Sequence, residues 1–495
     1  MLILAIDIGT SSTRTALFDQ SGVRIVTTTA QATHALITDR DGRAEIEPAA
    51  LLDGVRACIG RTLAAARRDR TLRGRAIAGV ATSCFWHSLV GTTADGRPLT
   101  RVITWADSRC RDDAARLRGH HDERRYHQRT GCMLRASFWP AKLAWLQRTE
   151  PRVFSRVARW MSPAEWLYLQ LSSGLRCAHG MATGTGLYDP EAMSWDAPSL
   201  ARFGVPQSSL SPIADTPLRL DRRWHRAWPE IADAAWYPAI GDGAANNLGV
   251  GATRRGWAAI NFGTSGAVRI LRDRGEARAP FGLFCYRVDA RRFLVGGAIS
   301  NAGSLRAWCL DQLRLPEDPS AIERALADRP GPDHGLRVLP FWLAERAPTW
   351  REDLRGAIVG LTQATSALDV LQATTEASFH RLATIIDLLP GSRSRLRIAV
   401  GGGIQKSRGA LQRLADVLGR EVRPSLEPES SLSGAAVLAL ERLRSADQIA
   451  ATTGEPIAPR RTHARAYARE RVELAALERT LYPTDSTKRT RRTRR

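Results

Sequence analysis

Lysine is almost absent from this chain of 495 residues. It occurs only at Lys142, Lys406 and Lys488, so 69 of the 72 basic residues are arginines, and the net charge is +22. Because the arginines alternate with acidic residues instead of forming one stripe, we expect a charged surface and no specific nucleic-acid interface. The exception is the basic run at residues 483–495, which predicts a disordered tail.

The sequence also lacks long apolar runs and paired cysteines. No stretch of about 18 apolar residues occurs, so we expect no membrane span. Asp7 interrupts the first apolar run too early for a secretory leader. Seven cysteines without a CxxC pair are typical of reduced thiols, and they argue against a disulfide framework or a zinc site. We therefore expect a cytoplasmic protein, and its length predicts two large domains.

The first residues combine two apolar runs with a polar turn, which predicts a β-hairpin. Its turn has the groups that a phosphate needs, because glycine lets backbone N–H groups approach an anion and hydroxyls add further donors. Asp7, just before the turn, can hold Mg²⁺. An ordinary polar turn is the alternative interpretation. The residues expected at phosphate are Gly9, Thr10, Ser11, Ser12 and Arg14.

The same pattern recurs about 250 residues later. A strand-like run over 258–262 ends in Gly263, Thr264, Ser265 and Gly266, and a second apolar run follows. Alone, this motif is also typical of a plain turn. Two such hairpins predict two related domains, each with one phosphate loop directed toward a shared cleft.

Strand-like and helix-like segments alternate along the chain, which predicts an α/β fold. A third short strand, 396–400, runs into Gly401, Gly402 and Gly403. The other expected strands are 76–81 and 89–93, and the expected helices are 51–67, 140–147, 164–171, 407–418, 435–444 and 463–481.

Four segments in order resemble the FGGY carbohydrate kinases of the actin/Hsp70/sugar-kinase superfamily. They are 7–14, 241–249, 261–266 and 401–407, and the resemblance runs from Met1 to about Tyr482. It implies an α/β fold of two ribonuclease-H-like domains with the active site in the cleft between them. The expected domains are 1–245, with the sugar side and the first phosphate loop, and 246–482, with the ATP side.

Within that family the gluconate kinases are most similar. The residues that carry this likeness are 87–89, 98–100, 103–109, 345–348, 355–356 and 360–362. The likeness implies ATP-dependent phosphorylation of D-gluconate at its terminal hydroxyl. Residues 239–243 depart from it, because Ala-Ile-Gly-Asp-Gly is nearer to the sister kinases.

The resemblance also implies roles for single residues. Asp242 falls on the catalytic aspartate of the family, which accepts the proton of the sugar hydroxyl; alone, Gly-Asp-Gly is typical of a turn. Asp7 falls on the Mg²⁺ side. Asn301 is a further ATP-side candidate, with a helix N-cap as its alternative. The expected ATP and phosphate contacts after the first hairpin are Gly263, Thr264, Ser265, Asn301, Gly402, Gly403 and Lys406.

Four residues are expected to bind the sugar: His87, Trp105, Asp107 and Arg109. Polyol recognition needs fixed hydrogen-bonding groups, and an aldonate carboxylate favours an arginine partner. A structural histidine and an Asp-Arg surface pair are the alternatives at these positions.

Other functions remain open from the sequence. Xylulose or another ketose or polyol can replace gluconate with the same chemistry. The other classes are a non-catalytic sugar-binding regulator and an ATPase of the actin or Hsp70 type. The expected partners are ATP and a small carbohydrate or sugar acid, with Mg²⁺ as cofactor and a homodimer as a possible assembly.

Overall fold

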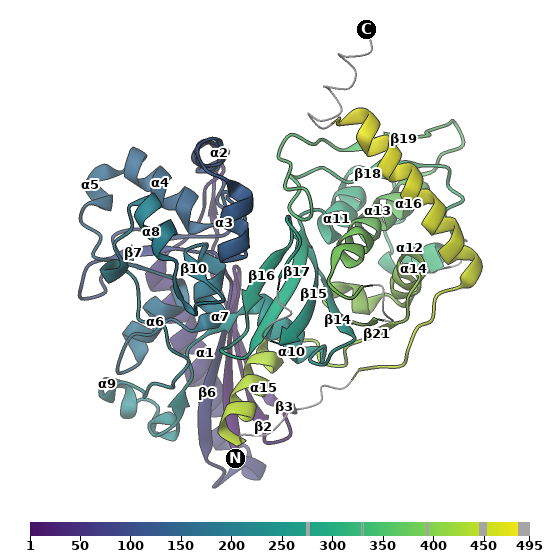
Figure 1. The fold of residues 1–495 in the computed structure, drawn as a ribbon. Helices are drawn as coiled ribbons and strands as arrows, with labels where there is room; N and C mark the ends of the chain where they lie inside the picture. The colour runs from purple at the N-terminus through teal and green to yellow at the C-terminus, as the bar shows by residue number, and fades with distance from the viewer. Residues whose placement is uncertain (274–277, 328, 330, 393–395, 445–452, 484–495) are drawn as a thin grey trace. The chain divides into compact units, whose positions relative to one another are not determined.

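Residues 2–19 form a β-hairpin because two apolar runs flank a short polar turn. In the computed structural model, which describes residues 1–273, 278–327, 329, 331–392, 396–444 and 453–483, β1 (Leu2–Ile8) pairs antiparallel with β2 (Ser12–Asp19) (Figure 1). All of β1 is buried, as expected for a strand that is covered on both faces. The predicted hairpin is confirmed.

The first main sheet is built around β1. Its strand order is β12 (Ala235–Trp236), β6 (Ile77–Cys84), β1, β2, β3 (Arg24–Thr33), and β13 (Ile240–Gly241) also pairs with β6. β1 runs antiparallel to β2 and parallel to β6. The parallel pairing with β6 places the ends of β1, β6 and β13 at one edge of the sheet, where the turn after β1 begins.

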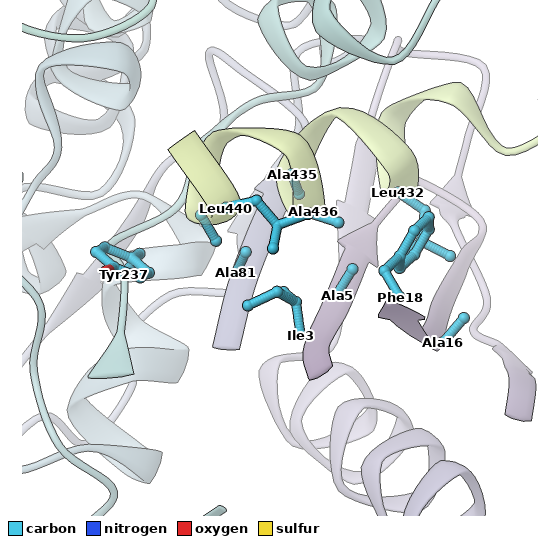
Figure 2. Close-up of a cluster of buried hydrophobic side chains, with 11 residues drawn as sticks. Ile3, Ala5, Ala16, Phe18, Ala81, Tyr237, Leu432, Ala435, Ala436 and Leu440 are labelled. Atoms are coloured by element: carbon cyan, nitrogen blue, oxygen red, sulfur yellow. The ribbon is translucent and has the colours of Figure 1, made fainter. Parts of the chain in front are cut away.

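Helices cover both faces of this sheet, because successive side chains of a strand point to opposite faces and apolar side chains lie on both. On one face, Ile3, Ala5 and Phe18 pack against α15 (Ser430–Arg444), through Ala436 and Leu440 (Figure 2). On the other face lies α1 (Pro48–Arg68), where the Thr15 hydroxyl donates to the Cys58 carbonyl at 3.1 Å. Strand β1 is thereby packed between α15 on one face of the sheet and α1 on the other.

Smaller strands and helices complete the first half of the chain. The strands are β4 (Ile37–Thr38), β5 (Ala44–Ile46), β7 (Val90–Thr92), β8 (Val102–Ile103), β9 (Arg159–Met161), β10 (Tyr188–Asp189) and β11 (Ser194–Trp195). The helices are α2 (Arg111–His120), α3 (Glu123–Thr130), α4 (Trp139–Thr149), α5 (Pro151–Phe154), α6 (Pro163–Leu171), α7 (His179–Ala182), α8 (Ala197–Phe203), α9 (Arg222–His225) and α10 (Asp242–Gly249).

The second main sheet repeats the local pattern of the first. Its strand order is β16 (Phe284–Arg287), β17 (Arg292–Ile299), β15 (Gly266–Asp273), β14 (Trp257–Phe262), β20 (Arg397–Gly401), β21 (Val422–Pro424). β14 is antiparallel to β15 and parallel to β20, as β1 is to β2 and β6. The two hairpins predicted from the sequence therefore have the same strand pairing, with one parallel strand beside the first strand of each hairpin.

Helices of the second half surround a long buried helix, α13 (Ala367–Leu388). A capping box between Ser366 and Asp369 begins it. The apolar spacing of the sequence does not predict this helix, because polar residues such as Gln372, Glu376 and His380 occupy its buried face. The other elements are α11 (Gly303–Gln312), α12 (Pro319–Ala327), β18 (Arg337–Leu339), β19 (Ala357–Val359), α14 (Arg408–Leu418) and α16 (Arg461–Leu481).

The chain divides into two compact units that are each built from several segments. The first unit holds Met1–Thr253, Leu271–Val295 and Glu429–Ala451, and the second holds Arg254–Ile270, Gly296–Pro428 and Thr452–Arg495. The sequence predicts a single boundary at 245/246; the structure adds two later segments to the first unit. The predicted tail lies outside the described residues from position 484 on. None of the described helices combines the length and apolar character needed to cross a membrane.

Candidate active site

The turn after β1 is held in shape by a histidine that the sequence did not single out. The Gly9 N–H donates to the Ser12 carbonyl at 2.9 Å and closes the turn. Nε2 of His34 lies 3.0 Å from the Gly9 carbonyl and 3.1 Å from the Thr10 carbonyl. These contacts direct the carbonyls of Gly9 and Thr10 toward His34 and so fix the backbone of the turn. No local pattern marks His34, because it follows β3 and reaches the turn only through the sheet.

The turn also meets the predicted sugar-side segment. Nε1 of Trp105 donates to the Thr10 hydroxyl at 3.0 Å, and the Trp105 N–H donates to the Ser88 hydroxyl at 3.1 Å. Positions 10, 88 and 105, far apart in the sequence, are thus joined within the first unit. The structure brings together the first predicted phosphate loop and part of the predicted sugar site.

Acidic side chains gather at the end of β1. The Asp7 side chain is 11% exposed, and its Oδ2 lies 3.9 Å from Nη1 of Arg14. Nε of Arg14 lies 3.5 Å from Oε2 of Glu429. Burial raises the pKa of the Asp7 carboxyl to about 6, and the negative charge of Asp242 adds to the rise, while Arg14 opposes it. Asp7 and Asp242 are therefore close enough to repel each other.

Asp242 stands at the first turn of α10, directly after the short strand β13. Its Oδ1 accepts a hydrogen bond from the Gly243 N–H at 2.8 Å. Strand β13 passes closely over an indole, since a Cβ at Gly241 would lie 1.7 Å from Cε2 of Trp86. Only glycine fits there, so the first glycine of Gly-Asp-Gly is set by the packing of Trp86. The carboxylate is partly accessible and lies at the positive end of a helix.

His87 has a backbone conformation that is unusual for its residue type. Its φ is +66°, in the left-handed region, and its Nδ1 lies 2.6 Å from the Gly184 carbonyl. The His87 ring packs edge-on against Phe138, with centroids 4.7 Å apart. The ring is thereby oriented by contacts on two sides.

A buried lysine holds the backbone at His87. The Lys142 side chain is fully buried, and its Nζ donates to the carbonyls of His87, at 3.1 Å, and Ser137. Burial lowers the pKa of Lys142 to about 8. The sequence gives one indirect sign of this role: lysine is rare here, and arginine is used nearly everywhere else.

Asp107 and Arg109 are bonded mainly to each other. Nη2 of Arg109 lies 2.7 Å from Oδ2 of Asp107, and it also pairs with Glu45. Asp107, which is 2% exposed, further accepts the Ala44 N–H at 3.0 Å, and the Arg109 guanidinium lies over the Trp145 ring. This buried network folds the 104–109 loop onto β5. A contact of either residue with substrate stays a prediction.

The second unit contains a cavity of about 550 Å³ beside the other predicted phosphate turn. Gly263 and Thr264 line it, and the N–H of Gly303 donates to the Gly263 carbonyl at 2.9 Å, which fixes the turn on the start of α11. Of the other residues predicted on the ATP side, Gly403 and Lys406 line this cavity. Its apolar walls come from Phe262, Ala302, Leu326, Phe379, Ile404 and Ala410.

Ser265, Asn301 and Gly402 do not line this cavity. The Asn301 side chain donates to the Leu343 carbonyl and accepts from the Leu343 N–H, both at 2.8 Å, so it connects two segments of backbone. The N-cap of α11 is Ala302. Gly402 has φ +91°, and a Cβ there would lie 2.6 Å from Oδ1 of Asn261. Gly402 therefore permits the close approach of this loop to the end of β14.

The floor of the cavity contains charged residues that the sequence did not reveal. Gln372 and Arg413 line it, and Nη1 of Arg413 lies 2.7 Å from Oε1 of buried Glu376. The Tyr467 hydroxyl, from α16, donates to the same oxygen at 2.6 Å. His334, Glu376 and Glu470 lie close enough to share a cation, but arginine, tyrosine and histidine partners already satisfy the two carboxylates. This cluster is therefore structural.

Comparisons with known proteins agree over the whole chain. A gluconokinase of Bacillus subtilis (strain 168) is 28% identical over 460 residues, covering 88% of this chain and 87% of the relative. A glycerol kinase of Rhizorhabdus wittichii is 29% identical over 450 residues, covering 87% and 86%. The crystal structure of a gluconate kinase from Lactobacillus acidophilus shares the fold, with a TM-score of 0.89 at 24% identity and coverage of 98% and 99%.

Family comparison gives the same result for both halves. The N-terminal domain of the FGGY family of carbohydrate kinases matches residues 2–219, and the C-terminal domain of the same family matches residues 258–441. The two matches include both hairpin turns, Asp242 falls between them, and the fold is the two-domain α/β fold of this family. The chain belongs to the FGGY family of carbohydrate kinases.

Proposed function

We propose that this carbohydrate kinase transfers the γ-phosphoryl group of ATP to the terminal hydroxyl of D-gluconate, giving 6-phospho-D-gluconate. The observation that carries the substrate is the similarity to gluconokinases over 88% of the chain. The chemistry rests on the family and on the acidic site at the ends of β1 and β13. Xylulose and glycerol are the substrates of other similar kinases and are the competing candidates.

Asp242 is the proposed general base. Phosphoryl transfer needs a carboxylate that accepts the hydroxyl proton as the sugar oxygen attacks the γ-phosphorus and ADP leaves. Asp242 is partly accessible, and its backbone is fixed by the close contact of Gly241 with Trp86. The same indole adjoins His87, with ring centroids 6.2 Å apart. The proposed base and the proposed sugar-binding residue are thus supported by one side chain.

The acidic site also fits Mg²⁺. Asp7, Asp242 and Glu429 offer carboxylate oxygens, the ligands that this cation prefers. Burial is the main cause of the raised pKa of Asp7, and the negative charges of Asp242 and Glu429 add to the rise, which a cation would offset. When bound with ATP, Mg²⁺ neutralises phosphate charge. We assign Asp7 to the Mg²⁺ side, while the hydroxyls of Thr10, Ser11 and Ser12, the N–H groups at the turn and Arg14 bind phosphate oxygens; the Gly9 N–H closes the turn on the Ser12 carbonyl, so Gly9 contributes only the close approach of its backbone.

The cavity of the second unit is proposed to hold the nucleotide. Its apolar walls suit a purine base, and the N–H of Thr264, together with Lys406, suits phosphate, while the Gly263 N–H closes the turn on the Ser265 carbonyl at 3.0 Å. Free, buried cysteines at all seven positions support a reducing compartment, and with ATP as substrate we place the enzyme in the cytoplasm.

A coupled assay of ADP release tests this proposal. D-gluconate, other aldonates, xylulose, ribulose and glycerol are compared with purified full-length protein at fixed ATP. We expect the highest kcat/KM for D-gluconate. A higher value for a ketose or for glycerol would overturn the substrate while leaving the kinase chemistry in place.

The variant Asp242→Asn tests the base. We expect its kcat to fall by about 10³-fold, within the usual range for loss of a general base, with ATP affinity within about twofold of wild type. The matched control is Asp53→Asn on α1, whose side chain is 72% exposed. The control should keep full activity, and substantial kcat in Asp242→Asn would refute the assignment.

A further inference from the structure

A second cavity of the second unit lies at the opposite end of the strands that carry the nucleotide turns. Its volume is about 750 Å³. It is lined where β14 and β20 begin, at Trp257 and Arg397, which pair in the sheet. The nucleotide cavity is lined instead where the same strands end, at Phe262 and Gly403. The two cavities are therefore separate sites on one sheet.

The lining of this cavity is strongly basic. It includes four arginines and, among the described residues, one carboxylate, that of Glu421. About one residue in seven of the chain is arginine, so chance would place one or two among the eleven lining residues. Elsewhere in this unit arginines pair with carboxylates, as in Arg337–Glu473 and Arg460–Asp416. The four lining arginines are Arg255, Arg397, Arg420 and Arg423.

Neighbouring groups orient three of these side chains, those of Arg397, Arg420 and Arg423. Nη2 of Arg420 donates to the Ser392 carbonyl at 2.9 Å, and Nε of Arg423 lies 2.9 Å from Oε1 of Glu421. The Arg397 guanidinium lies over the Trp257 ring, 5.7 Å from its centroid. Fixed guanidinium groups lose little freedom on meeting an anion and match phosphate oxygens in pairs.

Small residues keep the cavity open. Gly256, Gly419 and Ala458 belong to its wall, and a Cβ at either glycine would meet no atom within 4 Å. The volume is in the range of small-molecule sites. Four cationic groups exceed what a single phosphate can engage, and the Trp257 ring offers a flat apolar wall for the carbon skeleton of a ligand.

We propose that this cavity is a binding site for a small metabolite that carries two phosphate groups, separate from the ATP site. The ligand is recognised by guanidinium–phosphate contacts from Arg255, Arg397, Arg420 and Arg423, with the Trp257 ring beside its carbon skeleton. Inorganic pyrophosphate and a hexose bisphosphate share the chemistry of two phosphates; only the second has a skeleton for the ring to contact.

Calorimetric titration of full-length protein tests the site. The probes are inorganic phosphate, pyrophosphate and a hexose bisphosphate, each in the presence of a saturating non-hydrolysable ATP analogue that fills the nucleotide cavity. We expect pyrophosphate and the bisphosphate to bind at least about tenfold more tightly than phosphate, and added salt to weaken both. The bisphosphate binding more tightly than pyrophosphate would identify an organic ligand, and the reverse would identify an inorganic one.

Matched variants locate the binding. Arg255→Gln with Arg397→Gln removes two exposed guanidinium groups, and we expect at least about tenfold weaker binding of the bisphosphate. Arg420→Gln is a second, independent variant from another wall. The control, Arg324→Gln with Arg479→Gln, removes the same charge from exposed helix positions outside both cavities and should bind as wild type.

Three results would overturn the proposal. They are unchanged affinity in both cavity variants, loss of all binding when the ATP analogue is present, and equal affinity for phosphate and pyrophosphate. Binding of a single-stranded RNA with no binding of either diphosphate would also refute it and would assign the arginines to nucleic acid. None of these measurements depends on the sugar substrate, so failure here is distinguishable from failure of the proposed gluconate activity.

Discussion

Replacing Asp7 with asparagine should stabilise the protein without ligands while abolishing its activity. Asp7 is a buried strand residue whose pKa is raised from 3.8 to about 6, first by burial and then by the charge of Asp242. At neutral pH the folded protein must keep this carboxylate ionised at a site that disfavours the charge. Asparagine has nearly the same shape and carries no charge, so the unfavourable term disappears.

The magnitude follows from the shift in pKa. A folded-state pKa above the unfolded value favours folding at low pH, and this advantage is lost as the pH rises through 6. With a rise in pKa of about two units, the ionised Asp7 lowers the free energy of unfolding by about 3 kcal/mol at pH 8. At pH 5, where the folded carboxyl is mostly protonated, the loss is about half of that. The Arg14 contact at 3.9 Å is also lost, so about 3 kcal/mol is the upper limit.

Thermal unfolding without nucleotide at pH 8 and pH 5, at one scan rate, measures the effect. We expect Tm of Asp7→Asn to exceed that of wild type by about 5 °C at pH 8 and by clearly less at pH 5. Asp53→Asn should show no such difference. In an Asp242→Asn background the gain should shrink, since one cause of the raised pKa is gone. An equal gain at both pH values, or a lower Tm at pH 8, would refute the electrostatic reasoning.

Two further predictions concern residues that hold backbone in place. Lys142→Met leaves the carbonyls of His87 and Ser137 without their donor, so KM for the sugar should rise about tenfold while KM for ATP changes little. Steady-state kinetics with each substrate varied in turn measures both constants. An equal rise of both KM values would refute a local effect on the sugar side. Gly402→Ala forces a Cβ to within 2.6 Å of Oδ1 of Asn261 at φ +91°, so ATP affinity should fall about tenfold or more. Gly60→Ala on α1 is its control, since a Cβ added there meets no atom within 4 Å, and equal losses in both variants would contradict the steric argument.

Local patterns are sufficient for the two hairpins and for six of the helices, α1, α4, α6, α14, α15 and α16. The strand over 258–262 and the helices over 164–171 and 463–481 lie within two residues of β14, α6 and α16. These elements are encoded by apolar spacing and turn residues, which act over a few positions. Apolar spacing does not predict helix α13, because its buried face is polar and its polar residues bond to distant segments, Gln372 to the Gly331 carbonyl and His380 to Glu470.

The structure brings some of the predicted site residues together, while their binding roles stay predictions. Trp105 bonds to Thr10 in the first predicted phosphate turn, and Gly263, Thr264, Gly403 and Lys406 line one cavity of the second unit. A sequence cannot tell whether a charged side chain has already found its partner, because that partner is distant in the chain. Arg109 is an example, since its guanidinium is held by Glu45, 64 positions away in the chain, as well as by the neighbouring Asp107.

The sequence alone determined that two Gly-Thr-Ser hairpins and a Gly-Asp-Gly turn occur in one chain, because hydrogen bonding and steric freedom in a turn depend on adjacent residues. Only the tertiary structure decided what supports them. It placed α15, from residues 430–444, on the sheet of β1, and Lys142 beneath His87. Such contacts depend on which distant surfaces fill the same space, and no local pattern records that choice.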